Sequence, residues 1–415
     1  MSQFSCLSFV HAHYILMYNI KHKDQGSEFF SYVTDGEKLS IDYVKDGIVL
    51  QLKLYIDGEL FVVGIKYENL FEDNNCRVKW QQHLSVNGAV TITAPFNDQN
   101  QLPDDVIDRF CYEIMPEIHH KIEWLDVEFS TMQRILYSAD YPKLTGLGVY
   151  DLTWEAAKDL FDDESYFVSI FKDRILSLFI TMSDYSKRKS SVQDVTEHIF
   201  IQTLTMFSNL RCLKFDRSFL YHRLTLHETL PNVYSSNLLE LHVVLDSYLD
   251  CLYILDGRFD QLHTCCVSIC SSSIGRLEKV INEKSLSSLK HFSLTQGGMT
   301  MMYNSFLIPL LRCMSNLEQL NLYFFSVNKS IIDGDNLEKN IISYMPKLNK
   351  FLFDICSVVS LNEHIRFPSH EQIQSTFKNF RSEQIISYVN SFSEEHEYHC
   401  HIYSISLARW FDIQA

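Results

Sequence analysis

Histidine and cysteine gather near the end of the chain, where His396, His399, Cys400 and His401 could ligate a metal ion. Zinc prefers four nitrogen or sulfur ligands in tetrahedral geometry. The stretch from Cys400 onward reads as a strand, and successive strand residues point to opposite faces. His399 and His401 would therefore share one face while Cys400 lies on the other. We interpret this cluster as a polar strand with one buried cysteine, and we predict no metal ligands and no cofactor.

Other groups that could act in catalysis lack the partners that catalysis needs. The pair Cys265-Cys266 lies in an apolar run, with Cys265 expected to point inward and Cys266 outward. A catalytic thiol needs a nearby base and a lowered pKa, and the sequence alone shows neither. The acids at residues 162–164 and at Glu394-Glu395 fit solvated loops, and Gly297-Gly298 lacks the context of a phosphate-binding loop. We therefore predict that the protein is not an enzyme and has no catalytic residues.

Composition limits the classes of partner. The 415 residues are 46% hydrophobic and 21% charged, which is the balance of a folded globular chain. The formal net charge of −16 disfavours a nucleic-acid binder, and the run Lys187-Arg-Lys189 is too short to reverse that. No run of 18 apolar residues occurs, so we expect no membrane span.

Cysteine usage indicates the compartment. The 11 cysteines form no CxxC pair and lie mostly in apolar runs, as expected for free thiols in a reducing environment. We predict a cytoplasmic protein, with the nucleus as an alternative. A disulfide framework and a signal peptide over residues 9–20 are the less favoured readings.

One apolar pattern recurs along the chain: an apolar residue, two variable residues, a second apolar residue, one variable residue and a third. The copies begin at Ile122, Leu144, Ile175, Leu210, Leu238, Leu262, Leu289, Leu317 and Leu348. Their spacings, from 22 to 35 residues, overlap and exceed the usual length of a leucine-rich repeat. Several copies share a lead-in such as Phe207-Ser-Asn, Met314-Ser-Asn or Met345-Pro-Lys. We therefore predict a leucine-rich-repeat solenoid.

The repeat pattern predicts strands and helices in alternation. The second and third apolar residues of each copy share one strand face and would enter the core, while the residue between them points outward. Residues 196–205, 305–312 and 336–344 have apolar residues near helical spacing. The fold class we expect is α/β, a horseshoe with parallel strands on its concave face and helices outside.

The two ends of the chain differ from the repeats. Alternating residues on both sides of Asp57-Gly58 predict a hairpin, and residues 89–94 predict a further strand. A polar break then separates a small β-rich region at 1–100, whose role stays open, from a repeat domain at 101–405. A short tail at 406–415 follows. Residues 384–392 have a helical pattern.

Particular stretches resemble F-box/leucine-rich-repeat proteins, whose horseshoe is of the ribonuclease-inhibitor type. The resemblance is carried by residues 102–126, Tyr141-Pro-Lys-Leu, and residues 237–243, 255–264 and 345–351. It implies a substrate receptor of a ubiquitin ligase, with the repeats holding the substrate and an F-box binding a Skp-type adaptor. A recognisable F-box is lacking here, because residues 102–121 supply one helix before the first repeat strand.

The expected function therefore rests on the outward strand residues. Mixed polar, charged and aromatic side chains on rigid strands suit protein recognition. We predict a protein-interaction platform, and the resemblance implies the F-box-type substrate receptor. The alternatives are a free leucine-rich-repeat scaffold, or a metal-dependent enzyme that uses the C-terminal His/Cys cluster. The predicted contact residues are Trp124, Asp126, Glu128, Lys214, Asp216, Glu240, His242, His291, Ser293, Gln319, Asn321, Tyr323, Lys350 and Asp354.

Overall fold

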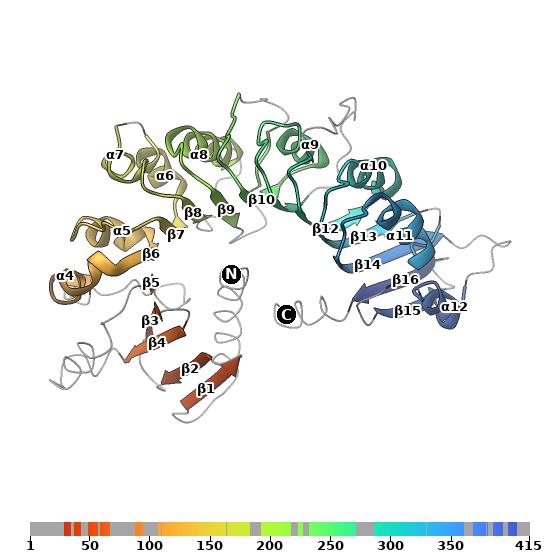
Figure 1. The fold of residues 1–415 in the computed structure, drawn as a ribbon, viewed down its shortest axis with the longest axis horizontal. Coiled ribbons are helices and arrows are strands. Elements are labelled where there is room, and N and C mark those ends of the chain that lie inside the picture. Colours follow the sequence, from red (N-terminus) through yellow and green to blue (C-terminus); the bar gives the residue numbers. More distant parts are fainter. Residues whose placement is uncertain are drawn as a thin grey trace. The chain divides into compact units, whose positions relative to one another are not determined.

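Two compact units make up the described chain, one within residues 16–188 and the other within residues 189–415. In the N-terminal unit, residues before 107 are described as strand backbone only. Asp163, Lys187-Arg-Lys189, Glu394-Glu395, His396 and the predicted tail at 406–415 lie outside the described residues. The computed structural model (Figure 1) describes residues 29–34, 37–42, 49–56, 59–66, 88–93, 107–182, 192–216, 223–226, 232–270, 286–360, 368–380, 385–392 and 397–404, apart from 109, 163, 329 and 379.

The N-terminal unit holds a mixed sheet with the strand order β4-β3-β5-β6-β7-β8 and a ribbon of β1 and β2. Strands β3 and β4 pair antiparallel with Ile56 opposite Glu59, so the predicted hairpin is confirmed. Strand β5 pairs antiparallel with β3 and parallel with β6, and one sheet therefore continues across residue 100. The bounds are β1 Phe29–Thr34, β2 Glu37–Asp42, β3 Val49–Ile56, β4 Glu59–Lys66, β5 Gly88–Thr93, β6 Ile122–Glu128, β7 Gly146–Leu152 and β8 Ser177–Met182.

The C-terminal unit holds a second run of strands in the order β9-β10-β11-β12-β13-β14-β16-β15. From β9 to β14 each strand pairs parallel with the next, whereas β16 pairs antiparallel with both β14 and β15. The bounds are β9 Cys212–Asp216, β10 Glu240–Leu245, β11 Thr264–Ile269, β12 His291–Thr300, β13 Gln319–Val327, β14 Lys350–Ser360, β15 Ile385–Phe392 and β16 Glu397–Ser404.

The helical segments between the strands are short. The longest described helix, α8, has 15 residues. In the C-terminal unit the helices lie on one face of the sheet (Figure 1). The segments of the N-terminal unit are η2 Phe110–Ile114, α4 Met115–Ile118, η3 His119–Lys121, α5 Phe129–Leu136, α6 Trp154–Leu160 and α7 Tyr166–Phe171. Those of the C-terminal unit are α8 Val192–Met206, α9 Tyr248–Ile254, η5 Tyr303–Leu307, α10 Ile308–Arg312, α11 Gly334–Asn340, η6 Ile342–Tyr344 and α12 His370–Ser375.

Strand alternation separates the two faces of the C-terminal sheet. In β11, β13 and β16 every second residue is buried and the residues between are half-buried. The parallel register sets Leu241, Cys265, Phe292 and Leu320 side by side, and each is at most 1% exposed. These are the inward positions that the apolar pattern predicts, and their burial removes apolar area from water along the whole row.

Backbone hydrogen bonds repeat from strand to strand just before each strand begins. One carbonyl of each such segment accepts two N–H groups from the next, at 2.7–3.2 Å. The accepting carbonyls belong to Arg211, Leu239, His263, Lys290 and Glu318. Because the accepting position is the same in each copy, neighbouring strands begin in the same relative register. Strands β12 and β13 shift register only further along, between Thr295 and Met299.

The shared lead-in has a structural role. The first leucine of six copies donates its N–H to the carbonyl three residues earlier, which closes a turn. In two copies the asparagine just before the first leucine also donates to the preceding copy, from Asn237 Nδ2 to the Ser208 carbonyl at 2.8 Å and from Asn316 Nδ2 to the Ser287 carbonyl at 2.9 Å. The recurring lead-in therefore joins adjacent copies laterally.

The fold class is confirmed at the level of a mixed α/β chain with a mostly parallel, open sheet. The predicted helix over residues 384–392 is wrong, because Ile385–Phe392 forms strand β15. Ile385, Ile386 and Val389 fit either periodicity, and eight paired positions with β16 decide in favour of the strand. Within the described ranges, no helix combines the length and the apolar character that a membrane crossing requires.

Candidate functional site

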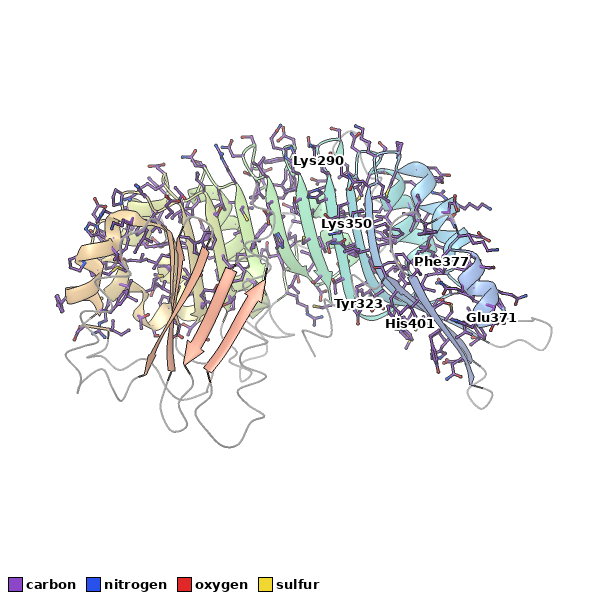
Figure 2. The ribbon with its side chains drawn as sticks, turned by 60° about the horizontal axis from the view of Figure 1, so that its bottom comes forward. Lys290, Tyr323, Lys350, Glu371, Phe377 and His401 are labelled. Atoms are coloured by element: carbon purple, nitrogen blue, oxygen red, sulfur yellow. The ribbon has the colours of Figure 1, made fainter. Side chains whose placement is uncertain are left out.

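The face of the C-terminal sheet opposite its helices carries the outward strand residues, and we call it the polar face. Register aligns these residues into rows across the strands. Figure 2 labels two of them, Lys350 and Tyr323. The first row is Glu240, Thr264, His291, Gln319 and Lys350; the second is Lys214, His242, Cys266, Ser293 and Asn321; the third is Ser268, Thr295, Tyr323 and Asp354. Ten predicted contact residues of this unit therefore join in one continuous pattern, and Asp216 ends β9 with a side chain outside the described part.

The predicted contact residues of the N-terminal unit are packed differently. The Trp124 indole N–H donates to Asp126 Oδ1 at 2.8 Å, and the Tyr150 hydroxyl reaches the same oxygen at 3.4 Å. Asp126 is only 3% exposed, so its carboxylate is covered. Two glycines leave room for this arrangement, since a Cβ at Gly146 or Gly148 would lie 2.0 Å from the Trp124 ring or from Asp126 Oδ1. Glu128 is half-buried at the end of β6.

Three charged side chains meet at the start of the polar face, and we call them the β9–β10 cluster. Glu240 Oε1 lies 2.7 Å from His242 Nε2 and 3.0 Å from Lys214 Nζ. The Lys214 side chain is 11% exposed and that of His242 is 19% exposed, so strand packing holds both cations in place.

The β9–β10 cluster shifts its own proton equilibria. Hydrogen bonding from His242 and attraction to Lys214 outweigh burial and lower the pKa of Glu240 to about 2. Burial opposes the charged form of His242, but the neighbouring Cys266 and Glu240 outweigh it and raise the pKa of His242 to about 9. A carboxylate and an imidazolium are therefore the forms expected at neutral pH. Further along the first row, burial lowers the pKa of His291, whose Nδ1 lies 3.4 Å from the Thr264 hydroxyl oxygen.

A second group of carboxylates and histidines lies where β14 meets β16, and we call it the β14–β16 cluster. His401 Nε2 lies 2.6 Å from Asp354 Oδ1, and His399 Nε2 lies 2.9 Å from Glu397 Oε2. Aromatic rings accompany these pairs, with Tyr403 at 5.0 Å from the His401 ring centroid. Figure 2 labels His401 and Tyr323 on this end of the sheet. Burial, with a smaller effect of Asp354, raises the pKa of Tyr323.

The His/Cys-rich end of the chain has the arrangement expected of a strand. Cys400 is fully buried against Ser357, whereas His399 and His401 lie on the polar face and each contacts a carboxylate. In the part of the chain that the structure describes, no three metal-ligating side chains converge.

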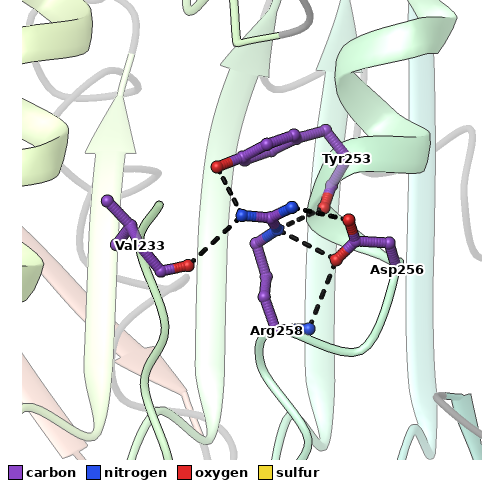
Figure 3. Close-up of polar contacts among 4 residues, drawn as sticks. All are labelled: Val233, Tyr253, Asp256 and Arg258. Atoms are coloured by element: carbon purple, nitrogen blue, oxygen red, sulfur yellow. Dashed lines mark hydrogen bonds and ion pairs between the residues drawn. The ribbon is translucent and has the colours of Figure 1, made fainter. Parts of the chain in front are cut away.

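Sequence reasoning missed an ion pair in the loop after α9, between a largely buried Arg258 and a half-buried Asp256 (Figure 3). The Arg258 guanidinium donates to Asp256 Oδ2 at 2.6 Å, to the Tyr253 carbonyl at 2.9 Å and to the Val233 carbonyl at 3.4 Å. It also stacks 3.4 Å from the Tyr253 ring centroid. Gly257 has a φ of 102°, a left-handed conformation that suits glycine and turns the chain between the two charged residues. Asp-Gly-Arg after a helix is the signal that could have indicated this turn.

Exposed apolar side chains near the β14–β16 cluster were also missed. Tyr388 is 61% exposed and Ile386 is 38% exposed, both on β15. They were missed because residues 384–392 were assigned to a helix, which gave no outward strand face.

Comparison with known proteins gives no relative for this chain. No protein-family model matches it, and neither the curated proteins nor the solved structures compared with it give a significant match.

Proposed function

We propose that this protein is a non-enzymatic recognition platform, a solenoid of the leucine-rich-repeat type whose polar face binds another protein. The observation that carries the proposal is the set of cross-strand rows, in which polar and aromatic side chains repeat in register over β9 to β14. Such rows present donors, acceptors and aromatic rings at fixed spacings, so little side-chain freedom is lost when a partner binds.

The repeat-like backbone supports the solenoid part of the proposal. The same carbonyl position accepts two N–H groups in five successive copies, and the lead-in turn recurs. Repeats that contact only their neighbours stack into an extended surface of this kind. The antiparallel β15 and β16 would then close the last repeat, where an uncovered edge would otherwise invite aggregation.

Affinity purification from cells, with one charge variant on each face of the sheet, tests the proposal. Asn321→Arg places a cation at the centre of the polar face, while Lys339→Glu changes charge on helix α11, on the other face. We expect specific proteins to be lost with Asn321→Arg and kept with Lys339→Glu. If both variants retain the same proteins as the unchanged chain, the polar face is not the binding surface.

Membership of a ubiquitin ligase is a separate part of the proposal that rests on the resemblance alone. Residues 107–121 give one interrupted helical segment before β6, where a Skp-type adaptor would need several packed helices. Co-purification of the full chain with such an adaptor would support the receptor function. Its absence would leave the platform proposal standing. The free thiols of the described cysteines fit the cytoplasmic or nuclear setting that such a platform would need.

A further inference from the structure

Cys266 lies in the middle of the second row of the polar face. Register sets it between His242 on β10 and Ser293 on β12. It is half-buried, so a small reagent can reach the sulfur. His242 is thus the direct cross-strand neighbour of Cys266, and its imidazole Nε2 lies 2.7 Å from a Glu240 carboxylate oxygen. Sulfur, imidazole and carboxylate thus follow one another across two adjacent strands.

This arrangement has the parts of an activated thiol. The nucleophilic form of cysteine is the thiolate, and a neighbouring imidazolium or ammonium group stabilises it. A carboxylate bound to the same imidazole orients the ring and stabilises the imidazolium. Lys214, 3.0 Å from Glu240, adds a second positive charge to the group.

Other cysteines of the chain provide internal references. Cys265 is the next residue along β11, but it points into the core, and burial raises the pKa of its thiol well above the usual value. Cys356 lies on the polar face, yet burial and the Asp354 carboxylate raise the pKa of that thiol to about 11. A carboxylate next to sulfur opposes the thiolate, whereas an imidazole next to sulfur favours it.

We propose that Cys266 is a covalent modification site for soft carbon electrophiles, with the His242 imidazolium stabilising the thiolate and Glu240 positioning His242. The thiol proton is released to water, the thiolate sulfur attacks the electrophilic carbon, and the leaving group departs with its electron pair. With an alkyl iodide the S–C bond forms, the C–I bond breaks and iodide is released. The site does not depend on a partner, and it goes beyond the proposed binding function.

Alkylation of the native full chain with limiting iodoacetamide tests the site. Peptide mass spectrometry over time gives a separate rate for each cysteine. Near neutral pH we expect Cys266 to react at least about tenfold faster than Cys356, because the thiolate fraction sets the rate. Cys265 should stay unlabelled, and its protection in every variant shows that the strand is intact.

The matched variants are His242→Gln and His291→Gln, two histidines of the same face. His242→Gln should slow Cys266 by about tenfold and make its rate rise with pH like that of an ordinary thiol. His291→Gln should leave the rate unchanged, and Glu240→Gln should give an intermediate rate with an altered pH profile. The proposal is overturned if Cys266 reacts no faster than Cys356, or if the two histidine variants behave alike.

Discussion

The β9–β10 and β14–β16 clusters use the same residue types on the same face of one sheet, but their surroundings differ. Each joins a carboxylate to a histidine at 2.6–2.7 Å. Glu240 also contacts Lys214, which is largely buried, whereas Asp354 lies beside aromatic rings and the thiol of Cys356. The extra cation makes the β9–β10 cluster a network of three charged groups. A third charge therefore changes the electrostatic environment of a carboxylate–histidine pair.

The strand pairing of the two clusters also differs. His242 and Glu240 lie two residues apart on one strand, so β10 alone fixes their spacing. His401 and Asp354 come from antiparallel strands far apart in sequence, and only the pairing of β14 with β16 brings them together. The first contact follows from local sequence, while the second depends on tertiary structure.

The largest expected loss of stability comes from a substitution in the core beneath the β9–β10 cluster. Leu241 is fully buried between Glu240 and His242. Leu241→Asp buries an unpaired charge and should cost more than about 4 kcal/mol of unfolding free energy, enough to unfold the unit. Glu240→Ala, one residue away, should keep the unit folded. Thermal melts followed by circular dichroism compare them, and equal losses of Tm would refute the assigned strand faces.

The buried Arg258 should have the next largest effect. Its side chain is 9% exposed and holds Asp256, Tyr253 and Val233 together. Arg258→Ala should lower the unfolding free energy by about 2–3 kcal/mol, because it leaves a half-buried carboxylate and two carbonyls without that donor. Arg312→Ala on the exposed helix face should cost less than about 1 kcal/mol. Urea unfolding measures both, and a reversed order would contradict the structural role of Arg258.

Removing the carboxylates compares the two clusters directly. Glu240→Gln should cost about 1 kcal/mol, a value already discounted for screening because 37% of that side chain is exposed. Asp354→Asn should cost about half as much, since an amide oxygen can still accept a hydrogen bond from the His401 ring nitrogen. Urea unfolding at neutral pH gives both values. Equal losses would mean that Lys214 adds nothing to the first cluster.

The pH dependence of the Glu240→Gln effect follows from the two shifts. Because the folded state lowers the pKa of Glu240 to about 2, the ionised carboxylate stabilises the fold at pH values above the ordinary pKa of a glutamate. This stabilisation is lost as the pH falls toward about 2. Because the folded state raises the pKa of His242 to about 9, the imidazolium stabilises the fold at pH values below the ordinary pKa of a histidine. This stabilisation is lost as the pH rises through about 9. The stability difference between the unchanged chain and Glu240→Gln should therefore be largest between about pH 5 and 7. A difference that is flat from acid to alkaline pH would contradict these shifts.

The smallest effect is the coupling between Lys214 and Glu240. In a double-mutant cycle, Lys214→Met should reduce the cost of Glu240→Gln by about 0.5 kcal/mol. The β9–β10 cluster would then resemble the β14–β16 cluster, which has no lysine among its described contacts. A coupling energy of zero would show that the 3.0 Å contact adds no stability.

Local sequence predicted those features that local physics decides. The repeated apolar spacing located the strands from β6 to β14, and Asp57-Gly58 located the hairpin between β3 and β4. Strand alternation also assigned His399 and Cys400 to opposite faces. These features need only the two-residue period of a strand and the conformational preferences of a turn.

Non-local pairing decided what the sequence did not predict. Residues 385–392 became a strand because β16 pairs with them, and their own spacing fits a helix equally well. Asp126 was predicted to face a partner but is covered, because Gly148 on the neighbouring strand leaves space that the carboxylate fills. The contact of Lys214 with Glu240 depends on the register of β9 against β10.

Site-specific photo-crosslinking tests the central claim most directly. A benzophenone amino acid would replace Tyr323 on the polar face, or Tyr344, which is 43% exposed on the helix side. Both positions are aromatic, so the two variants differ mainly in the face that carries the probe. We predict a discrete crosslinked protein from the Tyr323 position and none from Tyr344. Crosslinks from Tyr344 alone, or the same product from both positions, would contradict recognition through the polar face.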